Sequence, residues 1–542
     1  MKQIISPAKA LFSGRVYQDS FNLVNQVSSE QEELVAEFNY QLDKFLAARE
    51  QLFLEFDRLG EQSTEYINQL KELGLFSLIV PEEYGGLSLG ARAYSRVVAQ
   101  TSYYDAATSL TIGAHSSIGI KALLLFGNEE QKRRYLPRLA TGELIAAFCL
   151  TESGSGSDAA SIKTNAELKG DDWILNGEKI WITNGGIADF FTVFARTNSE
   201  SGRLSCFMVE RSFGGVMSGK KEDKMGIRAS NTTTVSFENV KVPKENLIGE
   251  VGQGFKIAMA VLNNGRTGLG GGCVGGIRRC LDLAVNHAKQ RRQFGRPLIE
   301  FELINEKINT IKRLHLAAES VVELVGGLID NQAEDYSVEA AISKVFSTEA
   351  LWRASYEALQ IAGGSGFMKD YIYEKITRDS RINMIFEGTN EILRLYIGLN
   401  AFKAVGANLS KMTRRSFKGN FAGALAVLFE QLRIWTIGVN IPVRTENEHE
   451  ARQANLYLNP RRNLKLATNI LVRKGELATI RYGKKLVEKQ LLTAGMADAL
   501  INLFVAYSIY FRKTPFNEEY QTLAAEAIVN CCRTSISVLQ DL

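Results

Sequence analysis

Apolar residues recur at helical spacing along the first quarter of the chain. Over residues 30–59 and 62–73 they return every three to four positions, the period of an α-helix that buries one face. The sequence Pro81-Glu82-Glu83-Tyr84-Gly85-Gly86 interrupts this pattern, because proline and glycine favour turns. Residues 28–146 are therefore expected to form a helical domain, which follows a segment over residues 1–27.

A stretch of strand-like sequence comes next. Trp173–Ile182 surrounds Asn176-Gly177, a dipeptide typical of two-residue hairpin turns, so a hairpin is expected here. Further short strands are expected over residues 190–195, 204–209 and 232–237, between glycine-rich turns. Together these strands predict a small β domain over residues 147–258.

Helical spacing returns from about residue 259 onward. One apolar stripe alternates steps of four and three along a long helix: Ile304, Ile308, Ile311, His315, Ala318, Val322, Val325 and Ile329. His315 lies on this stripe, where a packed core histidine is favoured over a ligand. Residues 259–400 are thus expected to form a C-terminal helical bundle.

Residues 401–542 are also helical in pattern and poor in strands, so they form a helical extension. We expect it to be set apart by the region of Gly406, Gly419 and Pro442. The order helices, strands, helices predicts an α+β fold that is mostly helical.

Two glycine-rich segments look like nucleotide-binding loops without matching them fully. Gly270–Gly275 fits G-x-G-x-x-G, but no predicted strand precedes it, so close helix packing is the favoured interpretation. Ser153–Ser157 lacks the Lys-Ser/Thr that follows in a Walker A motif. Its backbone N–H groups can still face a pyrophosphate or a flavin edge.

Composition is that of an ordinary soluble globular protein, with 45% hydrophobic and 23% charged residues. The charge is uneven, because residues 401–542 hold 20 Lys and Arg against 11 Asp and Glu, a net +9, whereas residues 1–400 carry −5. A basic extension can meet an acidic partner or an anionic membrane, or it can be a solvated face. No nucleic-acid-binding signature accompanies the charge.

Other classes of protein are disfavoured by simple counts. No apolar run approaches the ~20 residues that span a bilayer, and the longest candidates, residues 421–429 and 500–511, fit buried helices. Six cysteines without disulfide or metal spacing indicate a reducing compartment, and four scattered histidines argue against a metal centre. The N-terminus lacks an apolar signal core, so secretion is not expected.

The segment Ile385-Phe386-Glu387-Gly388-Thr389-Asn390-Glu391 carries the most suggestive chemistry. A glutamate followed by glycine can be approached closely by a thioester or a flat cofactor. The segment is expected to be a loop that feeds a helix, whose first N–H groups can polarise a carbonyl. This arrangement suits removal of a proton beside a carbonyl. The alternative is a solvated loop carboxylate at Glu387 next to a helix cap at Thr389.

Five motifs occur in a fixed order along the chain. They are Phe148–Asp158, Trp181–Gly186, Arg291–Gly295, Gln360–Gly366 and the segment around Glu387. In this order the chain resembles the acyl-CoA dehydrogenases over residues 28–400. Leu262–Arg266, the segment around Glu387 and the basic extension are most similar to the very-long-chain branch of that family.

The resemblance implies a fold and a reaction. The fold has an N-terminal helical domain, a central β-barrel or sandwich domain and a C-terminal four-helix bundle, with FAD in the cleft between them. Glu387 would remove the α-proton of an acyl-CoA while a hydride leaves the β-carbon for flavin N5, which gives a trans-2-enoyl-CoA in the first step of fatty acid β-oxidation. The Glu387 backbone N–H and a flavin ribityl hydroxyl would hold the thioester carbonyl.

The resemblance also assigns cofactor contacts. Trp181 would lie against the isoalloxazine face with Thr183 near N5, although Trp181 could instead belong to a β core. Arg291 and Gln360 belong to a group that would hold the adenine and pyrophosphate across a subunit boundary, where a planar guanidinium suits phosphate oxygens. The expected FAD contacts are Phe148, Cys149, Leu150, Thr151, Ser157, Trp181, Ile182, Thr183, Arg291, Phe294, Gln360, Gly364, Thr389 and Glu391.

Substrate contacts follow in the same way and comprise Ser157, Asn263, Arg266, Phe386 and Gly388. Asn263 and Arg266 match helix positions that face CoA. Some branches of the family place the base just before this arginine, but here that position is Gly265, which leaves Glu387 as the base. Gly265 would also leave room beside the acyl chain, or it could simply allow close helix packing.

For the extension the resemblance implies a homodimer in contact with a membrane surface, against the alternative of a plain helical cap. A basic group precedes the apolar residues 421–429 and consists of Lys411, Arg414, Arg415 and Lys418. Electrons would pass to an electron-transfer flavoprotein. The expected location is the bacterial cytoplasm, or the mitochondrial matrix or inner-membrane surface in a eukaryote. A flavin acyl-CoA oxidase and a respiratory-complex assembly factor of the same fold are the alternative functions.

Overall fold

The computed structural model describes residues 4–25, 28–197, 203–417, 439, 441, 459–512 and 518–542. The chain divides into two compact units. The helical unit comprises residues 1–28, 289–354 and 389–542, and the mixed unit comprises residues 29–288 and 355–388. Each unit has its own apolar core and is described by itself.

The mixed unit begins with helices, as the sequence predicts. They are α3 (Ser29–Ala47), α4 (Glu50–Leu59), α5 (Thr64–Glu72), α6 (Ala91–Tyr104), α7 (Ala106–Gly113), a π-helical turn (Ala114–Gly119), α8 (Lys121–Phe126) and α9 (Glu129–Ala140). Asp105 caps α7 by accepting from the Thr108 backbone N–H at 2.8 Å. A core of Phe53, Phe56, Tyr66 and neighbouring apolar side chains joins α3 to α7.

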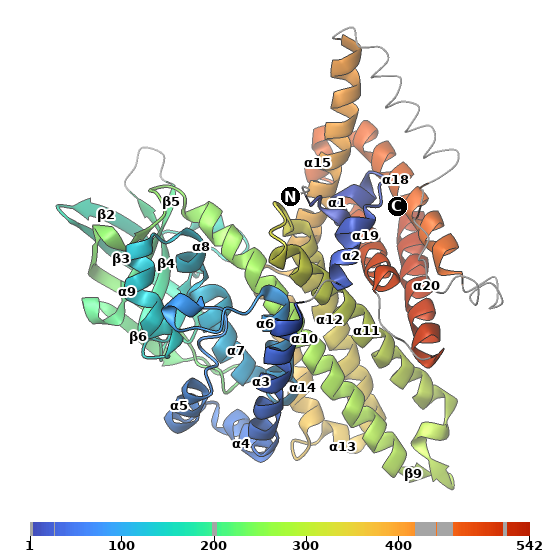
Figure 1. The fold of residues 1–542 in the computed structure, drawn as a ribbon, viewed down its shortest axis with the longest axis horizontal. Coiled ribbons are helices and arrows are strands. Elements are labelled where there is room, and N and C mark those ends of the chain that lie inside the picture. Colours follow the sequence, from blue (N-terminus) through green and yellow to red (C-terminus); the bar gives the residue numbers. More distant parts are fainter. Residues whose placement is uncertain are drawn as a thin grey trace. The chain divides into compact units, whose positions relative to one another are not determined.

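One eight-stranded mixed sheet follows (Figure 1). Its strands are β1 (Ala146–Cys149), β2 (Asn165–Lys169), β3 (Asp172–Thr183), β4 (Phe190–Thr197), β5 (Leu204–Glu210), β6 (Val216–Lys221), β7 (Thr232–Pro243) and β8 (Leu247–Ile248). The order is β6-β7-β3-β2-β4-β5-β8 with β1 beside β4, so the described strands form an open path and not a closed barrel.

The sheet buries apolar side chains on both faces. Phe190 and Phe194 of β4 join a core that includes Tyr135 and Leu139 of α9. The alternate residues Phe191, Val193 and Ala195 join a second core with residues of β3, β5 and β7. The two-residue period of β4 therefore separates a helix-covered face from an internal face, as in a sandwich.

The expected hairpin at Asn176-Gly177 is wrong. β3 runs unbroken from Asp172 to Thr183, and its register against β7 shifts between Leu175 and Gly177, which marks a bulge. Gly177 has φ of 149°, and a Cβ there would lie 2.5 Å from the Thr164 side chain. The glycine therefore serves close approach within a strand, and the β2–β3 connection turns at Gly170 instead.

The mixed unit is completed by long and short helices. α10 (Gly254–Gln290) and α12 (Ser337–Ala362) continue from one unit into the other, and α13 (Gly364–Phe367) and α14 (Ile372–Arg381) lie in the mixed unit. Close helix packing of the glycines in α10 is confirmed, because a Cβ at Gly271 would lie 2.6 Å from the Ser95 carbonyl oxygen of α6.

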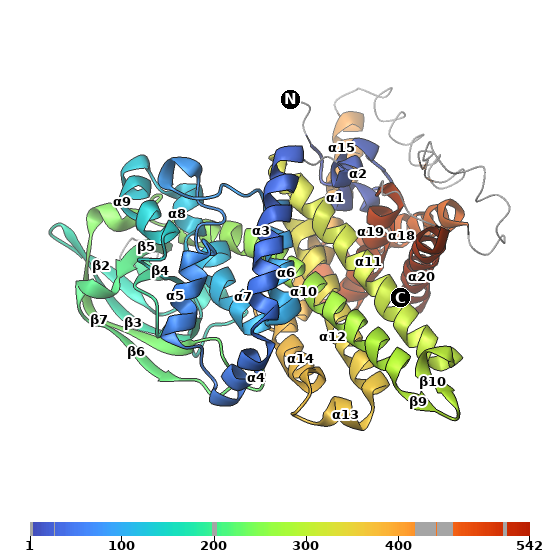
Figure 2. The same ribbon diagram turned by 60° about the horizontal axis from the view of Figure 1, so that its bottom comes forward.

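The helical unit gathers both ends of the chain (Figure 2). It holds α1 (Pro7–Phe12), α2 (Gln18–Asn22), α11 (Glu302–Asp330), the first part of α12, α15 (Asn390–Phe417), α18 (Pro460–Tyr482), α19 (Gln490–Phe511) and α20 (Glu518–Asp541), with a short hairpin of β9 (Arg292–Gln293) and β10 (Arg296–Pro297). Phe12 packs edge-on against Phe402, and Phe21 stacks on Phe511. The N-terminal helices are thus part of the core of the extension.

The predicted apolar stripe of α11 is confirmed, because Ile308, Ile311 and Val325 are buried. Gly406 does not set the extension apart, because it lies inside α15. Lys411, Arg414 and Arg415 fall in this helix, but their side chains, Lys418 and residues 421–429 lie outside the described residues.

Two helical stretches pass a length-and-composition test for membrane spans, although no uninterrupted apolar run is that long. They are Ala106–Phe126 and Gln490–Phe511, with mean hydropathy 1.3 and 1.5. Scattered polar residues such as Asp498 and Ser508 explain why the sequence count missed α19. Because 56% and 72% of the two windows are buried within the protein, core helices explain both.

Candidate active site

Glu387 lies in the loop that leads from α14 to α15, as expected. The Phe386 backbone N–H donates to the Ile382 carbonyl at 3.1 Å, which closes the turn before the glutamate. Glu387 then has φ of 58° and Gly388 has φ of 89°. A left-handed non-glycine residue costs about 1–3 kcal/mol and is typical of active sites. Three of the eight such residues in the described chain, Trp181, Phe294 and Glu387, are predicted site residues.

Helix α10 contacts the backbone of Glu387 through Arg266. Arg266 Nε donates to the Glu387 carbonyl oxygen at 3.2 Å, and Arg266 Nη1 donates to Asn263 Oδ1 at 2.7 Å. The arginine is only 6% exposed. The predicted substrate residues Asn263 and Arg266 are therefore brought together with Glu387, and the guanidinium holds the backbone of the loop that carries it.

The carboxylate of Glu387 lies over Gly265. A Cβ added to Gly265 would be 3.4 Å from Glu387 Oε2 and 2.9 Å from Ile118 Cγ2. This Oε2 atom is buried from solvent. The carboxylate oxygen therefore lies at ordinary van der Waals distance from the rival base position, and the tight contact that a Cβ there would make is with Ile118.

The wall that faces Gly265 is the π-helical turn after α7, which sequence reasoning missed. It carries Ile118 and the Ser117 carbonyl toward Gly265. His115 anchors the turn, because its Nδ1 accepts from the Ala146 N–H at 3.0 Å. Burial lowers the pKa of His115 to about 3, so the ring is neutral. Single π-turns are frequent at functional sites.

Trp181 projects from a second bulge in β3. The register against β7 shifts between Lys179 and Ile182, and Trp181 has φ of 57°. The indole is consequently 64% exposed. The Ile180 backbone N–H donates to the Thr151 carbonyl at 3.0 Å, which places the predicted Thr151 loop beside the tryptophan. The alternative of a core tryptophan is excluded by this exposure.

The first two expected flavin residues, Phe148 and Cys149, lie in strand β1. The Phe148 ring packs against Phe194 with centroids 5.1 Å apart. The side chains of Cys149, Leu150 and Ile182 are buried in the cores, so only their backbones can face a ligand. Burial raises the pKa of the Cys149 thiol to about 12.

The glycine-rich loop after β1 is open to a ligand. Ser157 is exposed, and a Cβ at Gly154 or Gly156 would meet no atom within 4 Å. In α13, a Cβ at Gly364 would likewise meet nothing, and Gln360 is exposed. The glycine-rich loop and the start of α13 therefore expose backbone and polar side-chain groups on the surface of the mixed unit.

The remaining predicted residues lie in the helical unit. Phe294 is 93% exposed at the tip of the β9–β10 hairpin, where φ is 50°, and Arg291 beside it is also exposed. The Thr389 Oγ1 accepts from the Ile392 N–H at 3.3 Å, which confirms the predicted helix cap of α15. Glu391 is exposed in the first turn of α15.

Helix α14 rests on a buried charged triad that the sequence analysis did not single out. Lys375 Nζ lies 2.8 Å from both Asp105 Oδ1 and Asp379 Oδ2. Asp379 also accepts from the Ile227 N–H, and Asp105 caps α7. Burial opposes the charge of Lys375, but the two carboxylates outweigh it and raise the pKa of the ammonium. The i, i+4 spacing of Lys375 and Asp379 was the available signal.

The residues present fit a flavin dinucleotide. In the mixed unit, the exposed indole of Trp181 offers a flat face beside Thr151 and Thr183. In the helical unit, the exposed Arg291 offers a planar guanidinium suited to pyrophosphate. Among the described residues no cluster of His, Cys, Asp and Glu is arranged to hold a metal ion.

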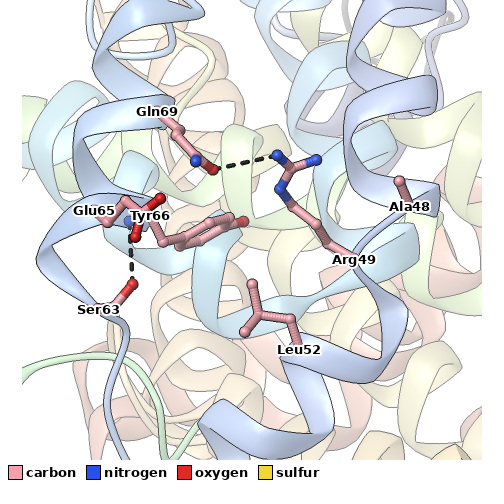
Figure 3. Close-up of a pocket in the computed structure, with 7 residues that line it drawn as sticks. All are labelled: Ala48, Arg49, Leu52, Ser63, Glu65, Tyr66 and Gln69. Atoms are coloured by element: carbon pink, nitrogen blue, oxygen red, sulfur yellow. Dashed lines mark hydrogen bonds between the residues drawn. The ribbon is translucent and has the colours of Figure 1, made fainter.

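A separate pocket of about 430 Å³ lies between the α3–α4 break and α5 (Figure 3). Its lining residues are Ala48, Arg49, Leu52, Ser63, Glu65, Tyr66 and Gln69. The pocket is open. Its lining cation, the Arg49 guanidinium, already donates to the Phe45 carbonyl at 2.8 Å and to Gln69 Oε1 at 3.3 Å. It includes none of the predicted site residues.

Comparison with known protein families covers most of the chain. The acyl-CoA dehydrogenase N-terminal domain matches residues 28–143, the middle domain matches residues 147–240, and the C-terminal domain matches residues 252–402. The human mitochondrial very long-chain specific acyl-CoA dehydrogenase is 43% identical over 457 residues, which cover 82% of this chain and 68% of that protein.

Solved structures agree with these matches. An acyl-CoA dehydrogenase from Bacillus anthracis complexed with FAD has a TM-score of 0.82 and 33% identity, and the match covers 98% of this chain and 91% of that one. A structure described as the electron transferring flavoprotein of Acidaminococcus fermentans has a TM-score of 0.65 and 36% identity, over 69% of this chain and 97% of that one.

Proposed function

The chain belongs to the acyl-CoA dehydrogenase family, and from this premise we propose that it oxidises long or very-long-chain acyl-CoA to trans-2-enoyl-CoA with FAD as cofactor and Glu387 as base. The observation that carries the proposal is the Glu387 carboxylate over Gly265, with its backbone held by Arg266. In some branches of the family the base stands on α10 just before the arginine, but here that position is Gly265, which has no carboxylate.

Glu387 binds the proton that leaves the α-carbon of the thioester. The left-handed turn at Glu387 and Gly388 sets the direction of the carboxylate, and Arg266 limits its movement. The carboxylate oxygen Oε2 is buried, which limits the access of bulk water to the reacting atom. FAD, when bound, supplies the acceptor for the β-hydride.

We assign the surrounding residues as the sequence predicts. Trp181, Thr183 and the Thr151 loop bind the flavin, with backbone contacts from Cys149, Leu150 and Ile182. Arg291 and Gln360 belong to the set that holds adenine and pyrophosphate in a homodimer. The other members of the two groups are Phe148, Ser157, Phe294, Gly364, Thr389 and Glu391 for FAD, and Ser157, Asn263, Arg266, Phe386 and Gly388 for acyl-CoA.

Anaerobic titration with acyl-CoA tests the assignment. The wild-type flavin absorbance should bleach, and Glu387→Gln should keep bound FAD while losing most of the bleaching, because the amide cannot accept the proton. Glu167→Gln, an exposed residue of β2, serves as the matched control and should bleach normally. Rapid bleaching by Glu387→Gln would refute the role of the base.

An aerobic activity assay, run beside the anaerobic titration, separates the competing functions. A dehydrogenase passes electrons to an electron-transfer flavoprotein and consumes little oxygen, whereas an oxidase consumes oxygen and forms hydrogen peroxide. A protein that acts only as an assembly factor would not bleach at all. Acyl-CoA substrates of increasing length define the chain preference, which we expect to lie at long and very long chains.

We propose the following domains for this enzyme: an N-terminal segment (1–27), a helical domain (28–146), a β domain (147–258), a helical bundle (259–400) and a helical extension (401–542). A relative in mitochondria and a similar structure from a bacterium favour the matrix or inner-membrane surface in a eukaryote, or the cytoplasm in a bacterium. Size-exclusion chromatography with light scattering tests the homodimer.

Peripheral contact with an anionic membrane is part of the proposal, and one surface of the extension supports it. The end of α18 and the start of α19 expose Leu477, Ile480, Val487 and Leu491, the last being 89% exposed. Exposed cations are interspersed with these residues along the chain, namely Arg481, Lys484, Lys485 and Lys489, against the single exposed acid Glu488 in residues 477–491. We call this surface the basic apolar tip. Exposed apolar side chains beside cations suit the headgroup region of an anionic bilayer.

Cosedimentation with vesicles tests this surface in the full-length protein. Binding should be strong with anionic vesicles, weak with zwitterionic vesicles, and reduced by salt. Ile480→Ser with Leu491→Ser should lower binding, as should Lys484→Gln with Lys485→Gln. Unchanged partitioning of both double variants would show that the tip is a solvated helical cap.

A further inference from the structure

We propose that a buried ion pair between Glu152 and Lys179 positions the two segments that face the flavin, by locking the loop after β1 to the bulged end of β3. The inference rests on the proposed FAD site. It adds two residues that have no assigned role in cofactor binding or in the reaction.

The ion pair is enclosed in the β domain. Lys179 Nζ donates to Glu152 Oε1 at 2.7 Å and to the Leu150 carbonyl oxygen at 3.0 Å. The side chains of Lys179 and Glu152 are 0% and 8% exposed. A lysine ammonium withdrawn from water in this way needs all of its charge neutralised locally, which ties it to the loop.

Glu152 organises the loop from its other side. It accepts from the Lys163 backbone N–H at 2.5 Å, and from the Thr164 N–H and Oγ1 at 3.0 and 2.6 Å. Its own backbone pairs with Ser155 in both directions. The carboxylate therefore joins the start of the loop to the residues just before β2, and the backbone of the same residue closes the glycine-rich turn.

The same pair reaches the tryptophan. Lys179 stands two residues before Trp181, at the start of the register shift that turns the indole outward. Between them, the Ile180 N–H donates to the Thr151 carbonyl at 3.0 Å. The position of the Thr151 loop relative to Trp181 is thus set by one side-chain pair and one backbone hydrogen bond.

Electrostatics support a role in geometry over a role in stability. Burial lowers the pKa of Lys179 despite the nearby carboxylate, so holding the ammonium here is unfavourable by itself. For Glu152, burial is outweighed by Lys179 and Thr164, and the pKa of the carboxyl is lowered. A pair of packed apolar residues would stabilise a sheet at least as well, whereas the ion pair dictates one loop conformation.

Three full-length variants test the inference. Lys179→Met removes the ammonium and Glu152→Gln keeps an oxygen acceptor for Thr164 while removing the charge. Lys169→Met is the matched control, because Lys169 pairs with Glu167 on the same sheet but both are exposed, at 61% and 50%. Thermal unfolding identifies any variant that does not fold, and Glu152→Gln, which is nearly isosteric, keeps the test usable if Lys179→Met does not.

The apoprotein of each variant is titrated with FAD, and flavin fluorescence and the visible spectrum are recorded. We expect the affinity for FAD to fall about tenfold or more in Glu152→Gln and Lys179→Met, because the loop must then be ordered on binding. The absorption bands of the bound flavin should also lose their vibrational fine structure. Hydrogen exchange of residues 150–164 should accelerate in the apoprotein. Lys169→Met should match the wild type in all three measurements.

Two outcomes would overturn different claims. Wild-type protein that fails to bind FAD would refute the proposed function. Wild-type protein that binds FAD, with folded variants of Glu152 and Lys179 that bind it equally well and with the same spectrum, would refute the positioning role, even if the loop exchanges faster.

Discussion

Arg266 donates a hydrogen bond from Nε to the carbonyl oxygen of Glu387, 3.2 Å away, although 121 positions separate the two residues in the chain. The contact joins the middle of α10 to the loop before α15. It explains how a loop residue keeps one orientation, since the guanidinium is itself held by Asn263 and is nearly fully buried. Helix α10 therefore helps the left-handed turn to hold the backbone of Glu387 in place.

Replacing Arg266 with methionine should lower kcat while FAD remains bound. A displacement of the base by about 1 Å can cost up to about a hundredfold in rate, so we expect a loss of about 10- to 100-fold. Steady-state kinetics and the flavin content of the purified variant measure the two effects. Lys256→Met, an exposed position on the same helix, is the control. A variant with normal kcat and only a raised KM would show that Arg266 serves CoA binding alone.

Gly265→Ala should impair catalysis without unfolding the protein. Alanine is intrinsically favoured over glycine in a helix by about 1 kcal/mol, but its Cβ would lie 2.9 Å from Ile118 Cγ2 and 3.4 Å from Glu387 Oε2. The contact with Ile118 must displace the π-helical wall or helix α10, which holds the Glu387 backbone through Arg266, so kcat should fall at least about tenfold. Kinetics and thermal unfolding are compared with Gly406→Ala in α15, which lies outside the proposed site and where the added Cβ meets no atom. Equal kcat values for the two variants would contradict the proposed crowding.

The order of helices and strands was predictable because it depends on local periodicity. The spacing of apolar residues gave α11 and the strands β4, β5 and β7, with boundaries within a few residues. The prediction of a turn at Asn176-Gly177 was wrong because a hairpin and a bulge can use the same dipeptide. Only the close contact with Thr164 decides between them, and this is a tertiary contact that the local sequence does not show.

The site was predictable in part for the same reason. Glu387 and Trp181 belong to short motifs, and the structure places both at left-handed backbone positions. The contact from Arg266, the π-helical wall and the pair of Glu152 with Lys179 join positions far apart in sequence. No periodicity or spacing encodes such contacts, so they could not be read from the chain.

Gly275→Ala should destabilise the mixed unit. Its Cβ would lie 1.9 Å from the Ala99 carbonyl oxygen, a contact that only a shift of α6 or α10 can relieve. Overpacking of this kind typically costs about 1–3 kcal/mol of unfolding free energy. Gly406→Ala in α15 is the control, because its Cβ meets no atom and alanine should stabilise that helix by up to about 1 kcal/mol. Calorimetry should therefore show opposite shifts in Tm, and equal shifts would contradict the close packing of α6 on α10.

His115 should make the protein less stable as the pH falls. Burial lowers its pKa to about 3 in the folded state, whereas the unfolded side chain titrates near its ordinary value of 6.5. Between these values the unfolded state binds the extra proton, so this histidine lowers the unfolding free energy by about 1.4 kcal/mol for each pH unit below 6.5. His115→Asn cannot titrate and keeps an oxygen that can accept from the Ala146 N–H. The Tm of the variant should therefore fall less steeply than that of the wild type between pH 6.5 and 4.5, and parallel curves would show that the buried imidazole is not the group responsible.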